Sequence, residues 1–470
     1  FAAVDAIEAG LRVGFEAGSI REREIFAECV VSIESKALRH LFFAEREAAR
    51  IPGIPKDTPA AVIARAAVVG AGTMGGGIAM TYANAGIPVL LKDVDAAAVD
   101  RGLAAIRRNY EATLAKGRMT REQVDRTMAL IRPTTTYGGF HEVDIVVEAV
   151  LEDLDLKKQT FTELGRETRP DCILASNTST LDIDAIASVT RRPHAVVGTH
   201  FFSPANVMRL LEIVRGSTTG PQTVADALSL AKQLGKVAVV AGNCDGFIGN
   251  RMLAHYRREA DFLLEEGATP EQIDRVIRDF GFPMGPYAMV DLTGLDVSWR
   301  VRKRRNAERP PKGRYSHVQD RLCEMGRFGQ KTGSGFYRYE NGSRTPHPDP
   351  LVGELIRSIA REAGIAQRRI DDDEIRKRCI YALVNEAANI LAEAIAIRAS
   401  DVDVVWVYGY GFPGWRGGPL RYAEVVGLKN VYDDIAQFER EHGVYWTPSP
   451  LLAELATKGG SFFEPIPART

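Results

Sequence analysis

Short apolar runs alternate with helix-like segments in the first half of the chain. The runs are bounded by Gly, Pro or Asp, and they fall at residues 66–69, 89–91, 144–147, 173–175, 195–199, 210–214 and 237–240. Apolar runs of this kind, separated by helical periodicity, are typical of the buried strands of a parallel sheet. The pattern predicts an α/β domain over residues 63–242.

Helical patterns lie on both sides of this domain. Residues 1–50 are amphipathic and rich in Ala, Glu and Arg, and residues 51–60 hold three prolines and a glycine, which is typical of a linker. After about residue 243 the strand signals fade and long helical periodicity takes over. We therefore predict linker helices over 1–62 and an all-α region beyond the α/β domain.

The helical region carries a repeated motif. Gly281-Phe-Pro recurs 130 residues later as Gly411-Phe-Pro, and each copy is followed by an apolar stretch that ends in Gly-Leu. Chance recurrence is the alternative, because the tripeptide is short, but the order of the flanking features favours a duplication. The sequence predicts two helical domains, 243–342 and 343–470.

Charge and hydropathy exclude several functions. The 470 residues carry 60 Lys and Arg against 61 Asp and Glu, a net charge of −1. We expect no binding to nucleic acid or to a membrane surface, since both need a basic excess. No apolar run reaches the roughly 18 residues of a membrane-spanning helix. One basic segment, 300–316, is either a solvated loop or a site for the polyanionic tail of a ligand.

The five cysteines are scattered along the chain. They form no C-x-x-C pair, and no Cys/His cluster has zinc-like spacing, so we expect no metal site. The odd count argues against a disulfide framework and favours a cytoplasmic location, because the cytosol keeps thiols reduced.

A glycine-rich loop follows the first predicted strand. Gly70-Ala-Gly72-Thr-Met-Gly75 has a strand before it and a helix after it, which is the context of a dinucleotide-binding loop. The glycines permit a tight turn, let a pyrophosphate approach the backbone and allow close packing of helix on strand. Asp93 ends the next strand, where a carboxylate accepts hydrogen bonds from a ribose 2′-hydroxyl and repels a 2′-phosphate. The α/β domain is therefore predicted to be a Rossmann-type NAD-binding domain, with an ordinary glycine-rich turn as the alternative.

Polar side chains follow two further strands. Glu148 interrupts an apolar run and is a candidate for the nicotinamide end of the cofactor, because open α/β sheets bind ligands beyond the carboxyl ends of their strands. The alternative is a solvated strand end. The cluster from Ser176 to Thr180 either binds a polar substrate group or caps the following helix.

His200 and Glu212 are candidates for an acid–base pair. His200 ends one predicted strand and Glu212 lies inside the next, twelve residues on, so a turn between the strands brings the two side chains together. A carboxylate flanked by aliphatic residues needs a partner, and it would fix the imidazole tautomer and stabilise the imidazolium of a general base. The alternative is a structural histidine. Asn250, where the helical region begins, is a further candidate.

In order and spacing, these residues resemble the L-3-hydroxyacyl-CoA dehydrogenase family. Motifs at 282–287, 291–296 and 326–337 extend the resemblance. The doubled helical region resembles the multifunctional enzymes of fatty-acid β-oxidation, particularly the peroxisomal bifunctional branch. In that branch an enoyl-CoA hydratase/isomerase domain precedes the dehydrogenase, and residues 34–44 look like the helix that connects the two.

The resemblance implies roles for individual residues. It implies catalysis by Ser179, His200, Glu212 and Asn250, and substrate contact by Ser179, Asn250 and Tyr408. It implies cofactor contact by Gly70, Gly72, Thr73, Met74, Gly75, Asp93, Glu148, Ser179 and Ser203. Two positions depart from the pattern of many relatives. Ser203 stands where single-domain members usually have Asn, and Asp155 stands where many relatives carry a Lys on the cofactor side.

The implied activity is the NAD-dependent oxidation of (3S)-3-hydroxyacyl-CoA to 3-oxoacyl-CoA, with His200 and Glu212 as the general-base pair. Two alternatives stay open: a catalytically silent dinucleotide-binding structural protein, and a dehydrogenase of a short hydroxy acid without CoA. Single-domain relatives pair through their helical domain, so a duplicated domain implies a monomer. Association with a thiolase, as a further partner, is left open.

Overall fold

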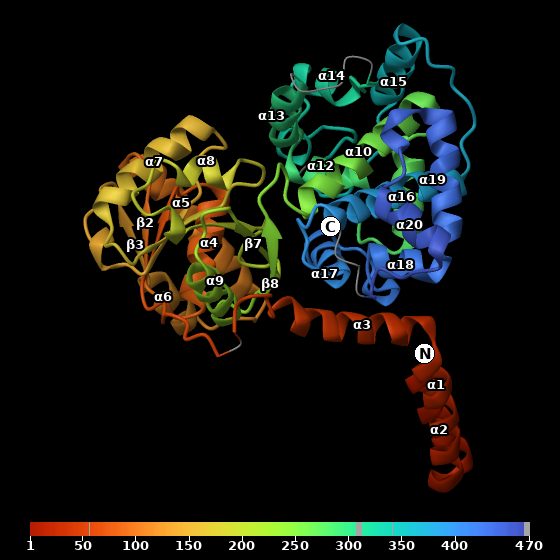
Figure 1. Cartoon of the computed structure of the whole chain (residues 1–470), viewed down its shortest axis with the longest axis horizontal. Coiled ribbons are helices and arrows are strands. Elements are labelled where there is room, and N and C mark those ends of the chain that lie inside the picture. The colour runs from red at the N-terminus through yellow and green to blue at the C-terminus, as the bar shows by residue number, and fades with distance from the viewer. Residues whose placement is uncertain (56, 307–312, 341, 465–470) are drawn as a thin grey trace. The chain divides into compact units, whose positions relative to one another are not determined.

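The computed structural model describes residues 1–55, 57–306, 313–340 and 342–464. They fall into two compact units, whose elements are labelled in Figure 1. The first unit holds Phe1–Asn250 together with Glu393–Tyr410, and the second holds Arg251–Ala392 and the chain from Gly411 onward. One helix from late in the sequence therefore belongs to the unit that the first half of the chain builds.

The first unit is built around a sheet with the strand order β3-β2-β1-β4-β5-β6-β7-β8. Neighbouring strands run parallel except for β6 and β7, which are antiparallel. The first six positions follow the strand order of a Rossmann fold. The strands are β1 (Ala66–Val69), β2 (Val89–Lys92), β3 (Ile131–Thr134), β4 (Ile145–Glu148), β5 (Ile173–Ser176), β6 (Val196–Phe201), β7 (Leu210–Arg215) and β8 (Val237–Gly242).

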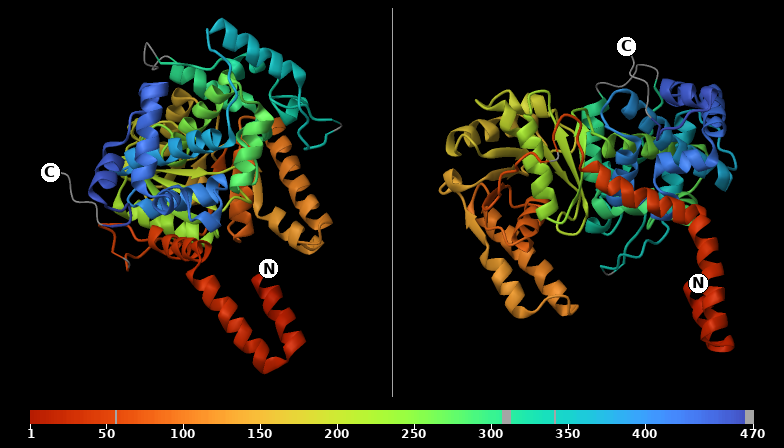
Figure 2. Two further views of the ribbon diagram at one scale, coloured as in Figure 1. Left: turned by 90° about the vertical axis from the view of Figure 1, so that its right-hand side faces the viewer. Right: turned by 60° about the horizontal axis from the view of Figure 1, so that its bottom comes forward.

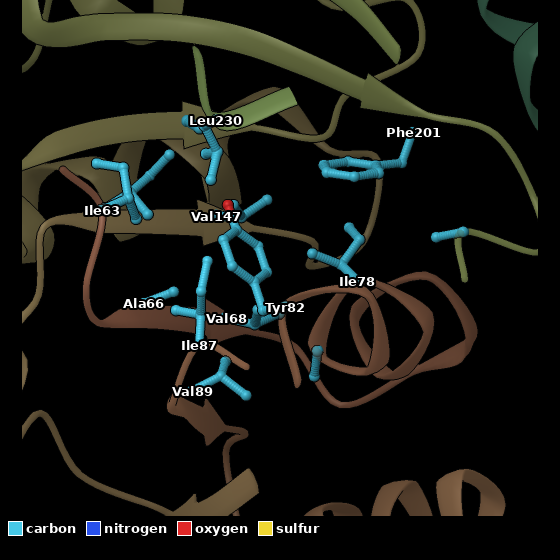
Figure 3. Packing of buried hydrophobic residues seen from close by; sticks show 14 of the residues in the cluster. Ile63, Ala66, Val68, Ile78, Tyr82, Ile87, Val89, Val147, Phe201 and Leu230 are labelled. Atoms are coloured by element: carbon cyan, nitrogen blue, oxygen red, sulfur yellow. The ribbon is translucent and has the colours of Figure 1, made fainter. Parts of the chain in front are cut away.

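Helices cover the sheet and give it a buried interior. They are α4 (Thr73–Asn84), α5 (Ala96–Ala115), α6 (Arg121–Ala129), α7 (Leu154–Glu167), α8 (Ile183–Ala187) and α9 (Pro221–Gln233). Val68 of β1 and Val147 of β4 are register partners, and they share one apolar cluster with Ile78 and Tyr82 of α4 (Figure 3). Because most strand residues are buried, the strands read as continuous apolar runs, as in other covered parallel sheets.

The predicted strands all form, and one further strand is present. Most of them extend one or two residues beyond the apolar run, which places Glu148, Ser176 and His200 inside β4, β5 and β6. The unpredicted strand is β3, at the edge of the sheet, where only Ile131 is buried. Pro133 cannot donate to a strand ladder, and an edge position tolerates it. The apolar pattern missed β3 because an edge strand needs no apolar run.

The predicted N-terminal helices are α1 (Ala2–Val13), α2 (Phe15–Val31) and α3 (Ile33–Ala48). α1 and α2 form a hairpin (Figure 2), and α1 buries none of its side chains. α3 packs instead against α17 (Ala399–Tyr410), the helix that joins the first unit from late in the sequence.

The second unit is helical, as the sequence predicted. In the described residues no strand follows β8. The helices are α10 (Gly249–Glu266), α11 (Pro270–Phe280), α12 (Pro286–Thr293), α13 (Leu295–Asn306), α14 (Val318–Glu324), α15 (Pro350–Glu362), α16 (Asp372–Ala392), α18 (Pro419–Val426), α19 (Leu428–His442) and α20 (Pro450–Lys458). Of these, α10 begins in the first unit and continues into the second.

The two Gly-Phe-Pro motifs contact each other reciprocally. A Cβ atom on Gly281 would lie 2.8 Å from Pro413, and a Cβ atom on Gly411 would lie 2.9 Å from Pro283. Each motif precedes an eight-residue helix that begins with Pro, α12 in the first case and α18 in the second. A surface that contacts its own copy in this reciprocal way has two-fold symmetry. This arrangement supports the predicted duplication.

Candidate active site

The glycine loop connects β1 to α4 in a conformation that its glycines require. Gly70 has φ +103°, and a Cβ there would lie 2.6 Å from the carbonyl oxygen of Ala149. A Cβ on Gly75 would overlap the carbonyl oxygen of Gly70. Gly72, by contrast, has open space beside it, and no side chain caps the first turn of α4. The backbone N–H groups of that turn are therefore available to a phosphate.

Asp93 lies directly after β2 and is tied to the glycine loop. Its Oδ2 accepts a hydrogen bond of 2.7 Å from the backbone N–H of Ala71. Beside them lies a cavity of about 330 Å³, whose lining includes Gly72, Asp93 and Arg101. An uncapped helix start, a carboxylate and a hollow next to both fit the pyrophosphate and ribose of a dinucleotide. Lys92, the cation adjacent to Asp93, lies over the ring of Tyr137 instead.

Glu148 is not a solvated strand end. Its side chain is fully buried at the end of β4, where Oε1 accepts hydrogen bonds from Lys157 Nζ at 2.7 Å and from the backbone N–H of Val150 at 2.8 Å. Oε2 accepts a third bond of 2.7 Å from the hydroxyl of Ser176. These contacts brace the segment that Gly70 approaches. A direct contact between Glu148 and the cofactor stays a prediction.

A second carboxylate, Glu152, organises the polar cluster after β5. Its Oε1 accepts hydrogen bonds from Thr178 Oγ1 at 2.7 Å and from Ser179, through the backbone N–H at 2.8 Å and Oγ at 3.1 Å. Desolvation raises the pKa of Glu152, but the charge of Lys157 and these hydrogen bonds outweigh it, so the pKa lies below its ordinary value. The cluster does not cap α8, because Asp182 does so.

Sequence reasoning missed both Glu152 and Lys157. Lys157 is almost fully buried between the carboxylates of Glu148 and Glu152, at 2.7 and 3.4 Å. Many relatives were expected to carry a lysine at position 155, where this chain has Asp. Lys157 supplies a cation two positions further along α7. A lysine nine residues after a buried glutamate, across a turn and into a helix, gives no periodic signal, and only the fold brings the two together.

His200 and Glu212 form the predicted pair. They are register partners across β6 and β7, and His200 Nδ1 lies 2.7 Å from Glu212 Oε2. Glu212 is fully buried, and its other oxygen accepts hydrogen bonds from the backbone N–H groups of Ile248 at 3.2 Å and Gly249 at 3.0 Å. With Nδ1 held by the carboxylate, Nε2 is the ring nitrogen left to take a proton.

Asn250, at the start of α10, lies beside Ser179, which follows β5. The amide Nδ2 of Asn250 donates to the backbone carbonyl of Ser179 at 3.3 Å, and its Oδ1 accepts a 2.9 Å bond from the hydroxyl of Tyr410. The predicted substrate residue Tyr408 lies elsewhere, since its hydroxyl donates to Glu45 of α3 and its ring lies under Arg209. Ser203 is exposed in the turn after β6. The roles of Tyr408 and Ser203 stay predictions.

Two arginines of the basic segment 300–316 make hydrogen bonds within the helical unit. Arg302 donates to the carbonyl of Ser316 at 2.5 Å, and Arg314 donates to Glu266 at 2.5 Å and to Glu265 at 3.1 Å. Residues 307–312 of the segment lie outside the described residues. Two of the arginines thus serve packing of the helical unit.

Comparison with known proteins gives the family. Residues 65–244 match the description "3-hydroxyacyl-CoA dehydrogenase, NAD binding domain", and residues 246–339 and 375–461 match the C-terminal domain of the same enzymes. The solved (S)-3-hydroxybutyryl-CoA dehydrogenase of Ralstonia eutropha is 36% identical, with a TM-score of 0.56, and the match covers 60% of this chain and 100% of that one. The chain belongs to the 3-hydroxyacyl-CoA dehydrogenase family.

Within this family, the chain is similar to the multifunctional branch. It is 42% identical to the peroxisomal bifunctional enzyme of Danio rerio, over 97% of this chain and 66% of that one. The dehydrogenase part of multifunctional enzyme 1 from C. elegans is 29% identical with a TM-score of 0.66, over 88% of this chain and 96% of that one. The chain therefore spans about two thirds of the length of the bifunctional relatives.

The comparisons overturn one expectation. The cytoplasmic location expected from the cysteines is wrong, because the relatives that match 97% of the chain are named peroxisomal enzymes. Free thiols indicate a reducing environment and do not distinguish between compartments that provide one. In the described residues no helix is long and apolar enough to cross a membrane, and no three acidic, His or Cys side chains are grouped as metal ligands.

Proposed function

We propose that the chain oxidises (3S)-3-hydroxyacyl-CoA to 3-oxoacyl-CoA with NAD, as the dehydrogenase part of a multifunctional β-oxidation enzyme. The observation that carries this proposal is the His200–Glu212 pair, buried in the same compact unit as the glycine loop and Asp93. A fully buried carboxylate that fixes one nitrogen of an imidazole is the arrangement of a general base.

His200 acts as the base. Oxidation of the alcohol removes a proton from the hydroxyl and a hydride from C3. His200 Nε2 takes the proton, while Glu212 holds the ring through Nδ1 and stabilises the imidazolium that forms. Two backbone N–H groups donate to the other oxygen of Glu212 and hold its carboxylate in place as this charge develops. When bound, NAD accepts the hydride.

Ser179 and Asn250 orient the substrate in this proposal. Ser179 Oγ donates to Glu152, so its remaining hydrogen-bonding capacity is that of an acceptor. It can accept from the substrate hydroxyl or from a hydroxyl of the bound cofactor. Asn250 Nδ2 has one N–H on the carbonyl of Ser179 and a second for the substrate oxygen near the thioester.

The proposal extends to the organisation of the chain. We propose linker helices over 1–62, the NAD-binding domain over 63–242 and two helical domains over 243–342 and 343–470. The two separate matches to the C-terminal domain and the reciprocal Gly281–Pro413 and Gly411–Pro283 contacts support the division. Since the second copy occupies the surface that the first would offer to a partner subunit, we propose a monomer.

The N-terminal helices and the location belong to the same proposal. α1 and α2 expose large apolar side chains, among them Leu11, Phe15 and Phe26. Apolar surface of this extent normally contacts another protein surface. We propose that it packs against the hydratase part of the parent enzyme, and that this enzyme is peroxisomal like the relatives it matches.

One assay tests the activity. Purified protein is mixed with acetoacetyl-CoA and NADH, and nicotinamide absorbance is followed, with NADPH and free acetoacetate as parallel substrates. The proposal expects rapid loss of NADH absorbance with acetoacetyl-CoA alone. Reduction of free acetoacetate at the same rate indicates a non-CoA dehydrogenase. NADH binding without turnover of either substrate indicates a silent dinucleotide-binding protein.

A further inference from the structure

Helix α17 belongs in sequence to the second helical copy, but it packs in the unit that contains the catalytic pair. The backbone N–H of Gly242, at the end of β8, donates to the carbonyl of Ile395 at 2.8 Å. A Cβ on Gly409 would lie 2.5 Å from Leu210 of β7. Backbone pairing of the segment just before α17, together with close packing near the end of the helix, fixes α17 against β7 and β8.

Tyr410, the last residue of α17, reaches the catalytic amide. Its hydroxyl donates to Asn250 Oδ1 at 2.9 Å. The phenol ring stacks on Trp406, with centroids 4.7 Å apart, and meets Phe202 edge-on at 5.3 Å. Phe202 in turn lies 4.4 Å from the imidazole of His200. The ring of Tyr410 therefore packs against an aromatic residue that itself contacts the imidazole.

The chain makes room for this ring at Gly249. A Cβ on Gly249 would lie 2.5 Å from both the ring and the hydroxyl of Tyr410. Gly249 also donates its backbone N–H to Glu212. A residue with a side chain there would displace the phenol, so the close approach of α10 to Tyr410 depends on glycine.

An asparagine side chain can present either its oxygen or its NH₂ to a ligand, because the two ends differ little in size. Tyr410 removes this ambiguity for Asn250. With the phenol donating to Oδ1, the NH₂ group must lie on the side of Ser179, where it donates to the backbone carbonyl. Burial and the charge of Glu212 hold the pKa of Tyr410 well above its ordinary value, so the phenol stays a donor.

We propose that Tyr410 is a positioning residue, which fixes the amide of Asn250 with its NH₂ toward the substrate oxygen. The inference rests on the proposed dehydrogenase function. It means that the second helical copy completes the active site, in addition to its structural role. The corresponding residue of the first copy is Phe280, one position before Gly281, and it has no hydroxyl with which to do the same.

The test removes the hydroxyl and keeps the ring. Without the phenol O–H, only the 3.3 Å bond to the carbonyl of Ser179 orients the amide of Asn250, and the productive orientation is populated less of the time. Tyr410→Phe should therefore lower kcat for acetoacetyl-CoA reduction about 5- to 30-fold, as expected for one lost buried hydrogen bond. The NADH dissociation constant should be unchanged, because the glycine loop and Asp93 are untouched.

A matched control separates positioning from stability. Tyr110 is also buried, and its hydroxyl donates to Asn84 Oδ1 at the same 2.9 Å, away from the catalytic residues. Tyr110→Phe removes an equivalent hydrogen bond, and it should lower the melting temperature comparably while leaving kcat unchanged. If Tyr410→Phe matches this control in kcat, the inference is overturned, whereas failure of the unmodified chain to reduce acetoacetyl-CoA overturns the proposed function instead.

A double-mutant cycle gives the second readout. If Tyr410 acts through Asn250, Tyr410→Phe should cost kcat nothing further once Asn250 is replaced by Ala. Additive losses in the double variant would show that the two residues act independently and would contradict the inference. Thermal melting and NADH titration of each variant verify that the compared proteins are folded.

Discussion

His200 and Glu212 face each other as register partners across the antiparallel pair of β6 and β7, with Nδ1 and Oε2 2.7 Å apart. The contact depends on the antiparallel direction of the two strands. An antiparallel neighbour brings a residue twelve positions away directly opposite the histidine, whereas a parallel neighbour would need a long crossover. The reversal of strand direction therefore brings the side chains of His200 and Glu212 into contact.

Lys157 should be essential for the stability of the cofactor-binding unit. Lys157→Met leaves the fully buried Glu148 without its cation, and removing one partner of a buried ion pair costs about 3–5 kcal/mol. Urea denaturation should show this loss in the free energy of unfolding. Lys158→Met, on the next and less buried residue, is the control and should have little effect. Equal stability of the two variants would contradict the assigned role of Lys157.

Asp93 should determine the preference for NADH over NADPH. Asp93→Ala removes both the acceptor for the ribose hydroxyl and the charge that repels a 2′-phosphate, each worth about 1–3 kcal/mol. Arg101 lines the same cavity, so the variant should gain affinity for NADPH as well as lose affinity for NADH. Fluorescence titration with both nucleotides measures the ratio. Equal affinities in the unmodified chain would refute the assignment of Asp93.

The full chain should be monomeric. The aromatic side chains of Phe280 and Phe282 in the first copy pack against Phe412 and Tyr422 in the second, which leaves this surface covered within one chain. Light scattering of the purified chain at micromolar concentration should give the mass of one copy. A stable homodimer in the same measurement would show that the duplication does not replace a partner subunit.

Asp401 should make the stability of the first unit depend on pH. It is buried in the first turn of α17, where burial raises the pKa of its carboxyl to about 7. Arg398, 3.2 Å away, lowers this pKa, and the charge of Glu47 in α3 raises it. Since the folded pKa is above the unfolded one, this group's stabilisation is complete below about pH 4 and is lost as the pH rises through about 7.

Asp401→Asn should therefore flatten the decrease in melting temperature between about pH 4 and pH 7. Asp433 is exposed and forms an ion pair with Lys429, one turn away on the same helix. Asp433→Asn is therefore the control and should leave the dependence of melting temperature on pH unchanged. If Asp401→Asn retains the slope of the unmodified chain, another group is responsible for the pH dependence.

Most of the fold could be predicted from local patterns in the sequence. Buried strands such as β1 and β4 are continuous apolar runs, and the glycine loop has a fixed spacing, so both could be predicted from sequence. The edge strand β3 could not, because a strand with one exposed face and a proline has no apolar run. Strand ends were also imprecise, since β4 and β5 end in the polar residues Glu148 and Ser176, and β6 holds His200 one position before its end.

Some residues of the candidate site could likewise be predicted from sequence, and others could not. His200 and Glu212 were predictable because they are close in sequence and sit in adjacent apolar runs. Tyr410 lies 160 positions from Asn250, and only the fold brings its hydroxyl to the amide. The resemblance implied a substrate role for Tyr408, two positions earlier on the same helix. Its hydroxyl donates to Glu45 of α3, and its contact with substrate stays a prediction.

Replacement of Glu212 tests whether the pair acts as one unit. Glu212→Gln keeps the shape of the side chain, but a neutral amide does not stabilise an imidazolium, so turnover should fall. Combined with His200→Gln, the loss should be far smaller than the product of the two single effects, as for residues that serve one step. Multiplicative losses in the double variant would indicate separate roles.

The most direct test of the account is the turnover of folded His200→Gln protein with acetoacetyl-CoA and NADH. Turnover per active site, with NADH titration as the measure of folded protein, should fall by about 10²–10⁴-fold, the usual contribution of a positioned general base. The NADH dissociation constant should barely change, because the nucleotide contacts lie at Gly70–Gly75 and Asp93. Near-normal turnover of the folded variant would contradict the proposed role of His200 as the base.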